Sequence, residues 1–371
     1  MTHPSSTSPG ARRFRAPGRV NLIGGQVDYH EGLIVAMALD RFVECIAIAS
    51  NDGRVTVESD GFDGAVVVDA AGHDEPANIE PAWGRLVGGV VRALAELGHP
   101  PVALRARIAS TLPIGGGLSS SAAFEVALAL ALTDAANTPI EPVALARAAQ
   151  RAEHLGTGVP CGIQDQMASV MGGVIVLDCR TLDVERLTLP DDLTVVVVDS
   201  GVQRTLEGSP WAQRRAESLA VADQLGLRVL RDATPEQVAD LPRGRHAVHE
   251  IRRVQAFTDA MRNDDRATMG ELMLASHESS RSDMECSTPE LDLLVECLVD
   301  AGAHGARLTG GGFGGCCVAI ADASHAATVA RSAVERYERE VSPPRSATAT
   351  IVRPGAAAGP SHPSATPNRT S

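Results

Sequence analysis

The residues best suited to chemistry form a glycine- and serine-rich run directly before an apolar segment, residues 122–132, that is expected to be a helix. Glycine lets the backbone approach a ligand, and a helix start adds unpaired N–H donors and a partial positive charge. The junction therefore suits a phosphate group. No lysine follows the glycines, so the run is not the common P-loop. The residues predicted to bind phosphate are Gly115, Gly116, Gly117, Leu118, Ser119, Ser120 and Ser121.

Three further motifs accompany this run: Arg15-Ala-Pro-Gly-Arg-Val-Asn-Leu-Ile-Gly24 followed by Asp28-Tyr29, Gly158-Val-Pro-Cys-Gly-Ile-Gln-Asp-Gln-Met-Ala-Ser169, and Leu308-Thr-Gly-Gly-Gly-Phe-Gly-Gly315. In sequence and in order, the four motifs resemble those of the galactokinases, a branch of the GHMP kinases. The resemblance implies an α+β chain of two domains. The N-terminal domain should be similar to the ribosomal S5 domain 2-like fold and the C-terminal domain should be ferredoxin-like, with the active site between them.

The resemblance implies an ATP-dependent sugar 1-kinase, whose chemistry depends mostly on positioning and charge neutralisation. Asp165 matches the family's aspartate beside the anomeric hydroxyl, and Arg19 matches the arginine that pairs with it. A nearby guanidinium lowers the pKa of an aspartate, which weakens it as a base but stabilises the developing transition-state charge. Asp165 is therefore either a general base or an electrostatic orienter. Ser121 and Glu153 are predicted to hold Mg²⁺, and the spacing from Glu153 to Asp165 is similar to that in galactokinases.

The predicted sugar pocket departs from the family at two neighbouring positions. Galactokinases usually read Gly-Glu-His-Thr-Asp-Tyr, whereas this chain has Gly25 and Gln26 in place of the glutamate and histidine that contact the C6 hydroxyl. Asp28, which matches the family's contact to the C3 and C4 hydroxyls, is retained. Losing such a hydrogen-bond partner changes substrate discrimination strongly. The pattern is similar to plant arabinokinases, and L-arabinopyranose has the galactose ring configuration without a C6 hydroxymethyl group.

Gly162 and Trp211 complete the predicted sugar contacts. Trp211 lies where the family commonly has tyrosine, and a tryptophan can stack on a sugar face but supplies no phenol oxygen. D-Galactose is favoured as the substrate because the rest of the chain reads most like galactokinases, and L-arabinose is the alternative. A uronic acid is disfavoured, because neither Gly25 nor Gln26 offers a cation for its carboxylate.

Two other kinds of function compete with a sugar kinase. A non-catalytic regulator that binds sugar and ATP is disfavoured, because Arg19, Glu153 and Asp165 are all present. A GHMP kinase for a non-sugar alcohol is disfavoured by Asp28 and by the segment around Asp165, which match the sugar branch. The last glycine motif resembles a loop that closes the active site near the phosphates or the sugar, and not a dinucleotide site. Its residues are Gly310, Gly311 and Gly312.

Composition narrows the partners to small molecules. The formal net charge of −13 argues against nucleic acid or an anionic membrane, but not against ATP, whose charge backbone donors and Mg²⁺ can neutralise locally. The polar start of the chain lacks the apolar core of a signal peptide, and no apolar run is long enough for a membrane span. The seven cysteines show no Cys-x-x-Cys spacing, which favours thiols in a reducing cytoplasm. No pattern predicts an oligomeric state.

The elements that must position these residues alternate between strands and helices. Strands are predicted over 102–108 and 193–198, a helix over 212–225, and a further helix from a capping Ser-Thr-Pro-Glu segment at 287–290 to about 301. Glycines at 172 and 173 and the loop at 187–192 indicate a domain boundary. The predicted organisation is a disordered tail over 1–13, an N-terminal domain over 14–185, a C-terminal domain over 186–353 and a disordered tail over 354–371.

Overall fold

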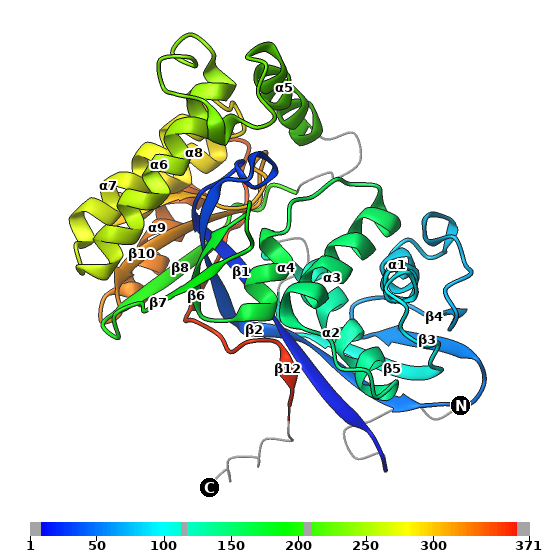
Figure 1. The fold of residues 1–371 in the computed structure, drawn as a ribbon. Helices are drawn as coiled ribbons and strands as arrows, with labels where there is room; N and C mark the ends of the chain where they lie inside the picture. The colour runs from blue at the N-terminus through cyan, green and yellow to red at the C-terminus, as the bar shows by residue number, and fades with distance from the viewer. Residues whose placement is uncertain (1–8, 113–116, 204–209, 362–371) are drawn as a thin grey trace, which may run out of the picture.

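The computed structural model describes residues 9–112, 117–203 and 210–361. Two β-sheets carry the packed helices of the molecule (Figure 1). Apart from β12, the first sheet is built from strands before residue 188 and the second from strands after residue 192, which agrees with the predicted α+β class of two units. None of the described helices is long and apolar enough to cross a membrane.

The first sheet has eight strands in the order β12-β1-β2-β5-β3-β4, with β6 paired to β2 and β7 paired to β6. All its pairs are antiparallel except β3–β5. Burial alternates along β5, as expected for a strand with one packed face and one solvated face. The strands are β1 (Arg12–Ile23), β2 (Leu33–Ala49), β3 (Arg54–Ser59), β4 (Ala65–Asp69), β5 (Leu104–Ser110), β6 (Val174–Asp178), β7 (Val184–Leu187) and β12 (Gly359–Pro360).

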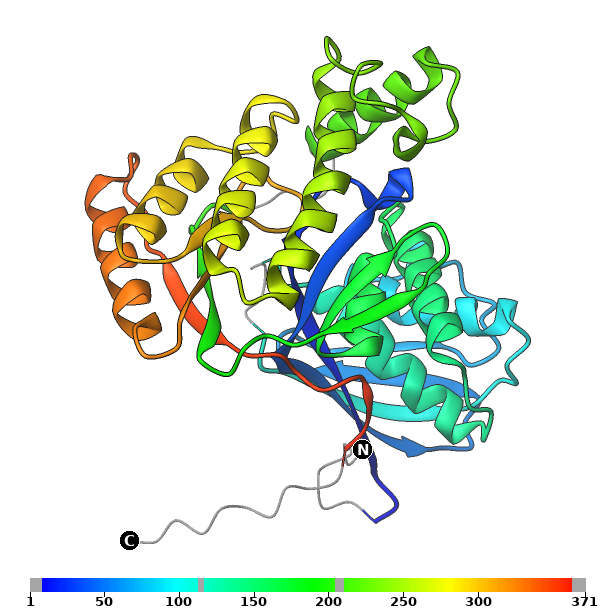
Figure 2. The same cartoon turned by 60° about the vertical axis from the view of Figure 1, so that its left-hand side comes forward.

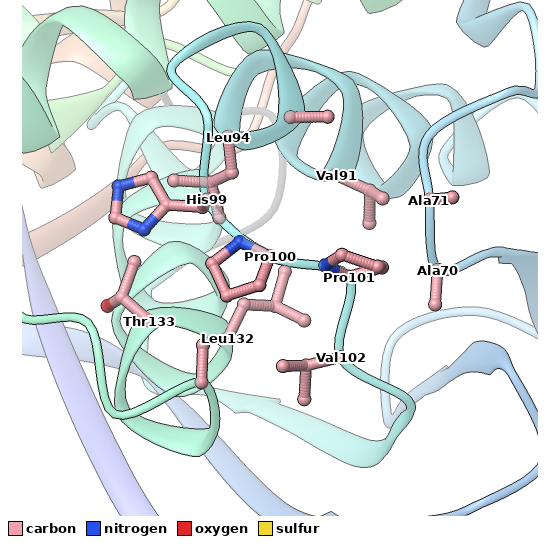
Figure 3. Close-up of a pocket in the computed structure, with 12 residues that line it drawn as sticks. Ala70, Ala71, Val91, Leu94, His99, Pro100, Pro101, Val102, Leu132 and Thr133 are labelled. Carbon is pink, nitrogen blue, oxygen red and sulfur yellow. The ribbon is translucent and has the colours of Figure 1, made fainter.

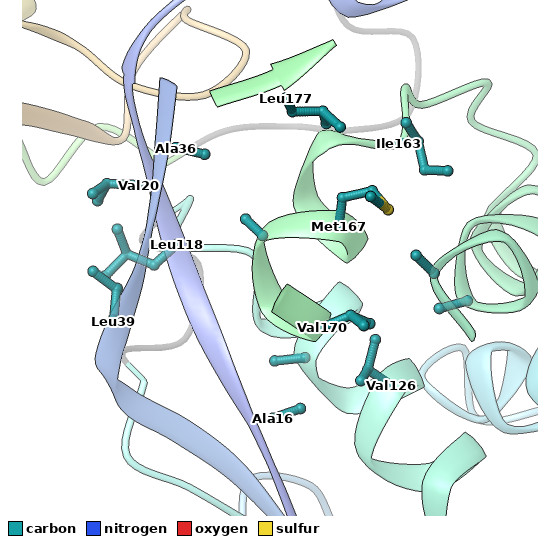
Figure 4. Packing of buried hydrophobic residues seen from close by; sticks show 14 of the residues in the cluster. Ala16, Val20, Ala36, Leu39, Leu118, Val126, Ile163, Met167, Val170 and Leu177 are labelled. Atoms are coloured by element: carbon teal, nitrogen blue, oxygen red, sulfur yellow. The ribbon is translucent and has the colours of Figure 1, made fainter. Parts of the chain in front are cut away.

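Four helices pack on this sheet: α1 (Gly84–Glu96), α2 (Ser120–Ala135), α3 (Pro142–Thr157) and α4 (Gln164–Met171). Helix α2 is buried around most of its circumference, which explains why its sequence is apolar on every side. Figure 4 shows Val126 of α2 close to Met167 and Val170 of α4, and all three belong to one buried core. This packing fixes the short helix α4, whose first turn carries Asp165.

The second sheet is antiparallel, in the order β11-β8-β10-β9. Its strands are β8 (Leu193–Asp199), β9 (Gly305–Leu308), β10 (Cys316–Asp322) and β11 (Thr348–Val352). Val195 and Val197 of β8 face the core shared with the first sheet, whereas Val196 and Val198 face a second core. Burial on both faces explains the uninterrupted apolar run that predicted this strand.

The helices of the second half are α5 (Pro210–Gln224), α6 (Pro242–Arg262), α7 (Arg266–Ser282), α8 (Pro289–Asp300) and α9 (Ala326–Glu340). Short 3₁₀ turns occur at η1 (Asp28–His30), η2 (Pro76–Asn78) and η3 (Leu230–Asp232). Thr288 caps α8 by accepting a hydrogen bond from the Leu291 N–H, which confirms the helix start predicted from sequence. The predicted strand at 102–108 is observed two residues later, as β5.

The end of β1 joins the two halves (Figure 2). The backbone N–H of Asn21 donates to the Thr309 hydroxyl at 3.0 Å, and that hydroxyl donates back to the Asn21 carbonyl at 3.1 Å. Thr309 directly follows β9, so the last glycine motif begins against the first motif of the chain. The motifs predicted to form the site therefore meet where the two sheets approach each other.

The predicted tail over 354–371 is wrong for residues 354–361. Strand β12 pairs with β1, the N–H of Gly355 donates to Ala38, and the N–H of Ala358 donates to Ser169. Residue 355 also approaches the backbone of Leu39 so closely that a β-carbon would lie 1.8 Å from its carbonyl oxygen. Hydrogen bonds to the sheet edge hold a segment whose composition alone is typical of disorder. Likewise, β1 begins at Arg12, inside the predicted tail over 1–13, and β7 extends to Leu187, past the predicted boundary at 185/186.

Candidate active site

Arg19 of β1 and Asp165 of α4 form a two-pronged ion pair. The guanidinium Nε donates to Oδ1 of Asp165 at 2.7 Å, and Nη2 donates to Oδ2 at 2.7 Å. The third nitrogen, Nη1, donates to the Gly117 carbonyl at 2.9 Å. Only 4% of Arg19 is exposed, so water screens its charge little. One buried cation therefore links the predicted catalytic aspartate to the glycine–serine run.

The described part of the glycine–serine run contacts both members of the Arg19–Asp165 ion pair. The Arg19 N–H donates to the Leu118 carbonyl at 3.0 Å, and the Ser119 hydroxyl donates to Oδ2 of Asp165 at 2.5 Å. Ser119 has the left-handed backbone conformation, φ 58°, at the start of α2, where Ser120 and Ser121 form the first turn. The Ser119 hydroxyl, predicted to contact phosphate, is thus engaged by the aspartate. Gly115 and Gly116 lie outside the described residues.

A second carboxylate accompanies the predicted metal ligand Glu153. Glu125 of α2 is fully buried, its Oε1 has no hydrogen-bond partner among the described residues, and its Oε2 accepts a long bond, 3.5 Å, from Gln166. Burial raises the pKa of Glu125, and the neighbouring Glu153 carboxylate raises it further. Glu125 lies one helical turn after Ser121, on the same face of α2. The sequence reasoning missed Glu125, although a glutamate inside an apolar helix is a signal that could have found it.

These groups fit a divalent cation shared with phosphates. Adjacent carboxylates with an unsatisfied buried oxygen are the hard oxygen donors that Mg²⁺ prefers, and Mg²⁺ commonly uses one or two carboxylates together with substrate phosphates. Among the described residues, no group of three or more His, Cys, Asp or Glu side chains is arranged to hold a metal ion.

Asp28 lies beside the ion pair in the predicted sugar pocket. Burial raises the pKa of Asp28 to about 6, and the charge of Asp165 contributes in the same direction. The Asp28 carboxylate fills the space next to Gly162, where a β-carbon would lie 1.7 Å from Oδ2. Gly162 is therefore required to be a glycine by the position of Asp28. The structure thus places Arg19, Asp28, Gly162 and Asp165 in one neighbourhood.

Both polar atoms of the Gln26 side chain form hydrogen bonds within the protein. It has the left-handed conformation, φ 60°, and its Nε2 donates to the Gly311 carbonyl at 3.1 Å. Its Oε1 accepts a long hydrogen bond, 3.4 Å, from the Tyr29 hydroxyl. Gln26 therefore anchors the last glycine loop and has less capacity left for a substrate hydroxyl.

Gly25 is held in place through its backbone. Its N–H donates to Oε1 of Glu250 at 3.1 Å, and its carbonyl lies 3.0 Å from Nε2 of His246. A β-carbon at this position would lie 2.5 Å from Nη2 of Arg307. Glu250, His246 and Arg307 come from α6 and β9, and the sequence reasoning named none of them.

The last glycine loop and Trp211 form one wall. A β-carbon on Gly311 would lie 3.2 Å from Cδ1 of Trp211, and one on Gly312 would lie 2.2 Å from the Cys286 carbonyl. Trp211 is in the first turn of α5. The structure thus brings Gly311 into contact with both Trp211 and Gln26. Gly310, which also has positive φ, begins the turn that follows Thr309.

A separate pocket of about 230 Å³ lies elsewhere in the first half of the chain (Figure 3). Its lining comes mainly from α1, the segment after it and the end of α2. His99 is the one titratable side chain in this lining, and its Nδ1 lies 2.9 Å from the Thr138 hydroxyl. The pocket contains none of the predicted site residues.

Comparisons with known families agree with the motifs. Residues 85–173 match the family described as GHMP kinases N terminal domain, and residues 257–339 match GHMP kinases C terminal. Residues 5–49 match the galactokinase galactose-binding signature.

Curated relatives cover most of the chain. A galactokinase of Roseiflexus sp. (strain RS-1) is 39% identical over 343 residues, covering 87% of this chain and 86% of the relative. A galactokinase of Homo sapiens is 37% identical over 350 residues, with the same coverage of both chains.

Among solved structures, a Lactococcus lactis galactokinase complexed with galactose superposes with a TM-score of 0.87 at 28% identity, covering 95% of each chain. A Methanococcus jannaschii mevalonate kinase superposes with a TM-score of 0.71 at 15% identity, covering 94% of this chain and 99% of that one. At that identity, the second likeness concerns the fold alone.

Proposed function

The chain belongs to the galactokinase family of the GHMP kinases, and from that premise we propose that it transfers the γ-phosphoryl group of ATP to the anomeric hydroxyl of a galactose-configured sugar, with D-galactose as the first candidate. The family makes the chain a phosphotransferase that acts on a sugar hydroxyl and uses ATP. The observation that carries the proposal is the link from Asp165 through Arg19 to Gly117.

In this proposal Asp165 faces the reacting hydroxyl. Each carboxylate oxygen has two lone pairs, so hydrogen bonds from Arg19 and Ser119 leave Asp165 able to accept from the sugar as well. The same donors stabilise its ionised form, which favours orienting the hydroxyl over strong basicity. Arg19 also provides positive charge where the transferring phosphoryl group develops negative charge.

The phosphates of ATP would occupy the start of α2. Backbone N–H groups of the described residues 117–121 and the helix terminus suit this role. When bound, Mg²⁺ would neutralise phosphate charge, and Ser121, Glu125 and Glu153 would hold it. We expect the nucleobase to bind beside Phe62 and Trp83, whose stacked rings have centroids 5.6 Å apart.

Phe62 lies at the same edge of the first sheet as the glycine–serine run. Phe62 closely follows β3, the glycine–serine run follows β5, and these two strands are parallel neighbours. The indole Nε1 of Trp83 is buried without a hydrogen-bond partner among the described residues. A buried donor beside a stacked ring pair fits a flat heterocycle with acceptor nitrogens.

L-Arabinose is the second candidate substrate, favoured by one observation. Gln26 is engaged with Gly311 and Tyr29, and Gly25 has no side chain, so neither residue readily replaces the missing contacts to a C6 hydroxyl. A sugar without that hydroxyl loses no contact at these two residues.

The thiols Cys45, Cys161 and Cys179 are consistent with the further proposal that the chain acts in the cytoplasm.

The test is ATP consumption by the full chain with Mg²⁺ and, separately, D-galactose or L-arabinose, reported as kcat/KM. The Asp165→Asn variant is the control, because ATP consumption that it retains comes from hydrolysis without sugar or from contaminating kinases. Turnover of either sugar that the variant loses supports the sugar 1-kinase, and the ratio of the two values selects the substrate. ATP and sugar binding without turnover of any sugar would instead support a regulator.

A further inference from the structure

Asn21 of β1 carries a buried amide whose oxygen and nitrogen both form hydrogen bonds. Only 1% of Asn21 is exposed. Its Oδ1 accepts from Nη1 of Arg307 at 2.6 Å. Its Nδ2 donates to Oε1 of Gln164 at 2.8 Å and, over a longer 3.3 Å, to the Gly24 carbonyl. One small side chain therefore joins β9, the start of α4 and the loop that follows β1.

The orientation of this amide follows from its partners. An arginine side chain only donates and a backbone carbonyl only accepts, so Oδ1 faces Arg307 and Nδ2 faces Gly24. Aspartate would set a second acceptor against the carbonyl, and leucine would offer neither a donor nor an acceptor. Because the position is buried, either change would leave a polar group without its partner. Asn21 is therefore required for its chemistry as well as for its size.

Asn21 and Arg19 lie on the same face of β1. They are two residues apart, and the pairing of β1 with β2 is regular between them. Arg19 binds Asp165, and Asn21 binds the residue directly before it, Gln164. No side chain caps the N-terminus of α4. The two side chains of β1 therefore hold successive residues in the first turn of this helix.

The second half of the chain is attached through the same residue. The backbone of Asn21 exchanges hydrogen bonds with the Thr309 hydroxyl, and its side chain accepts from Arg307. Glu250 of α6 accepts from the Gly24 N–H at 2.9 Å, while the Gly24 carbonyl accepts from Asn21. The loop after β1, α4 and the second half of the chain thus meet at one amide.

We propose that Asn21 is a positioning residue, which holds Gly24 and Asp165 in a fixed relation to each other and to the second half of the chain. This inference rests on the proposed roles of Asp165 and of the sugar loop, residues 24–28. Asn21 acts through Gln164 and Gly24 and takes no part in bond making. Phosphoryl transfer depends mostly on positioning, and a small displacement of the sugar from its acceptor group is costly.

The two contacts donated by Asn21 can be separated by mutation of the full chain. Gln164→Ala removes only the contact with α4, so it should lower kcat by about fivefold or more, as for one buried hydrogen bond, with little change in sugar affinity. Asn21→Ala also releases Gly24, so it should lower kcat by about tenfold or more and weaken sugar binding as well. Steady-state kinetics with D-galactose and L-arabinose, and calorimetry with each sugar, measure these effects.

The affinity for ATP distinguishes positioning from a general loss of structure. The partners of Asn21 lie outside the glycine–serine run, so the dissociation constant of ATP should change little in either variant. Asn263→Ala is the matched control, because its exposed amide donates to the Asp259 carbonyl at the end of α6. ATP affinity that falls together with sugar affinity would overturn the proposal.

A double variant tests whether Asn21 and Gln164 act together. Asn21→Ala with Gln164→Ala should be at most about twofold slower in kcat than Asn21→Ala alone, because both changes break the same hydrogen bond. Penalties that multiply would show independent residues and overturn the proposal. Where Asn21→Ala does not fold, Gln164→Ala decides: an unchanged kcat in that variant overturns the proposal.

Hydrogen exchange separates this inference from the proposed function, because it needs no turnover. In Asn21→Ala, or in Gln164→Ala for the helix alone, amides of residues 24–28 and of the first turn of α4 should exchange faster, while those of α2 keep their rates. Unchanged rates, or equal acceleration in α2, would overturn the positioning role. Failure of the unaltered chain to phosphorylate either sugar counts against the proposed function, and the exchange rates then decide this inference.

Discussion

Arg19 and Asp165, separated by 146 positions in the chain, meet through two hydrogen bonds of 2.7 Å each. The pair couples a strand of the first sheet to the shortest α-helix described beside it, and Nη1 of Arg19 extends the link to the glycine–serine run. Two parallel hydrogen bonds fix the carboxylate in angle as well as distance, because the guanidinium is planar. The substrate hydroxyl therefore meets an acceptor whose orientation is already set.

Replacing Asp165 by asparagine should lower kcat by about 10²- to 10⁴-fold, the usual range for a group that handles a proton in the transition state. The side chain keeps its size but loses its charge and one acceptor oxygen. Sugar affinity should change much less, because Asp28 and the wall at residues 25 and 26 are untouched. Calorimetry with the sugar and single-turnover kinetics measure the two quantities. A variant with nearly full kcat would remove Asp165 from the chemistry.

Sugar binding should weaken as the pH falls through about 6, where Asp28 gains a proton. The ionised carboxylate accepts hydrogen bonds from sugar hydroxyls more strongly than the neutral acid does. His30 does not contribute in this range, because burial lowers its pKa to about 3. A titration of the dissociation constant from pH 5 to pH 8 tests this, and Asp28→Asn should bind more weakly with no such pH dependence. An unchanged pH profile in that variant would assign the transition to another group.

The same raised pKa predicts the effect of Asp28 on stability. A carboxyl group whose pKa is higher in the folded chain holds its proton more tightly when folded. Its contribution to stability is therefore fully present below pH 3.8 and is lost as the pH rises through about 6. At pH 7, Asp28→Asn should raise the free energy of unfolding by about 1 to 3 kcal/mol. Denaturant unfolding at pH 4 and pH 7 measures this difference, and equal effects at both pH values would contradict the assignment.

Replacing Gly162 by alanine should raise the dissociation constant of the sugar by about tenfold or more, because small displacements of a binding group are costly. The added β-carbon would lie 1.7 Å from Oδ2 of Asp28, so the carboxylate must move. Gly359→Ala is the matched control, because a β-carbon there meets nothing within 4 Å. Equal sugar affinity in both variants would show that Asp28 does not contact the sugar.

Replacing Glu125 by glutamine should weaken Mn²⁺ binding in the presence of ATP by about 10- to 100-fold, as for partners of metal ligands. The fully buried carboxyl group has an unsatisfied oxygen beside Glu153, and an amide in its place cannot ionise to bind the metal. Electron paramagnetic resonance measures the Mn²⁺ affinity and does not depend on enzyme activity. Glu141→Gln, at the exposed residue directly before α3, is the control. Unaltered Mn²⁺ affinity in Glu125→Gln would restrict the site to Ser121 and Glu153.

Exchanging residues 25 and 26 for the glutamate and histidine usual in the family should shift kcat/KM towards D-galactose. The β-carbon of the new glutamate would lie 2.5 Å from Nη2 of Arg307, so the guanidinium must move to admit the side chain. Parallel kcat/KM values for D-galactose and L-arabinose test this shift. A shift away from galactose would contradict the importance of these two positions.

The sequence by itself determined the family, the order of the motifs and the residues that meet at Asp165. Such information is local: glycines permit a particular backbone, Thr288 caps a helix, and a continuous apolar run makes β8 a strand buried on both faces. It also identified Gly25 and Gln26 as unusual, because a short motif can be compared position by position.

The tertiary structure alone decided which side chains complete the site. Glu125, Glu250 and Arg307 lie outside the parts of the motifs that were interpreted, and each gains its role from partners on other elements. Likewise, the composition of residues 354–361 predicts a disordered tail, whereas in the structure the segment forms hydrogen bonds with β1 and β2. The electrostatic state of a buried group is a sum over neighbours that packing brings together from distant segments. Spacing along the chain therefore cannot reveal that Arg307 of β9 lies beside Gly25.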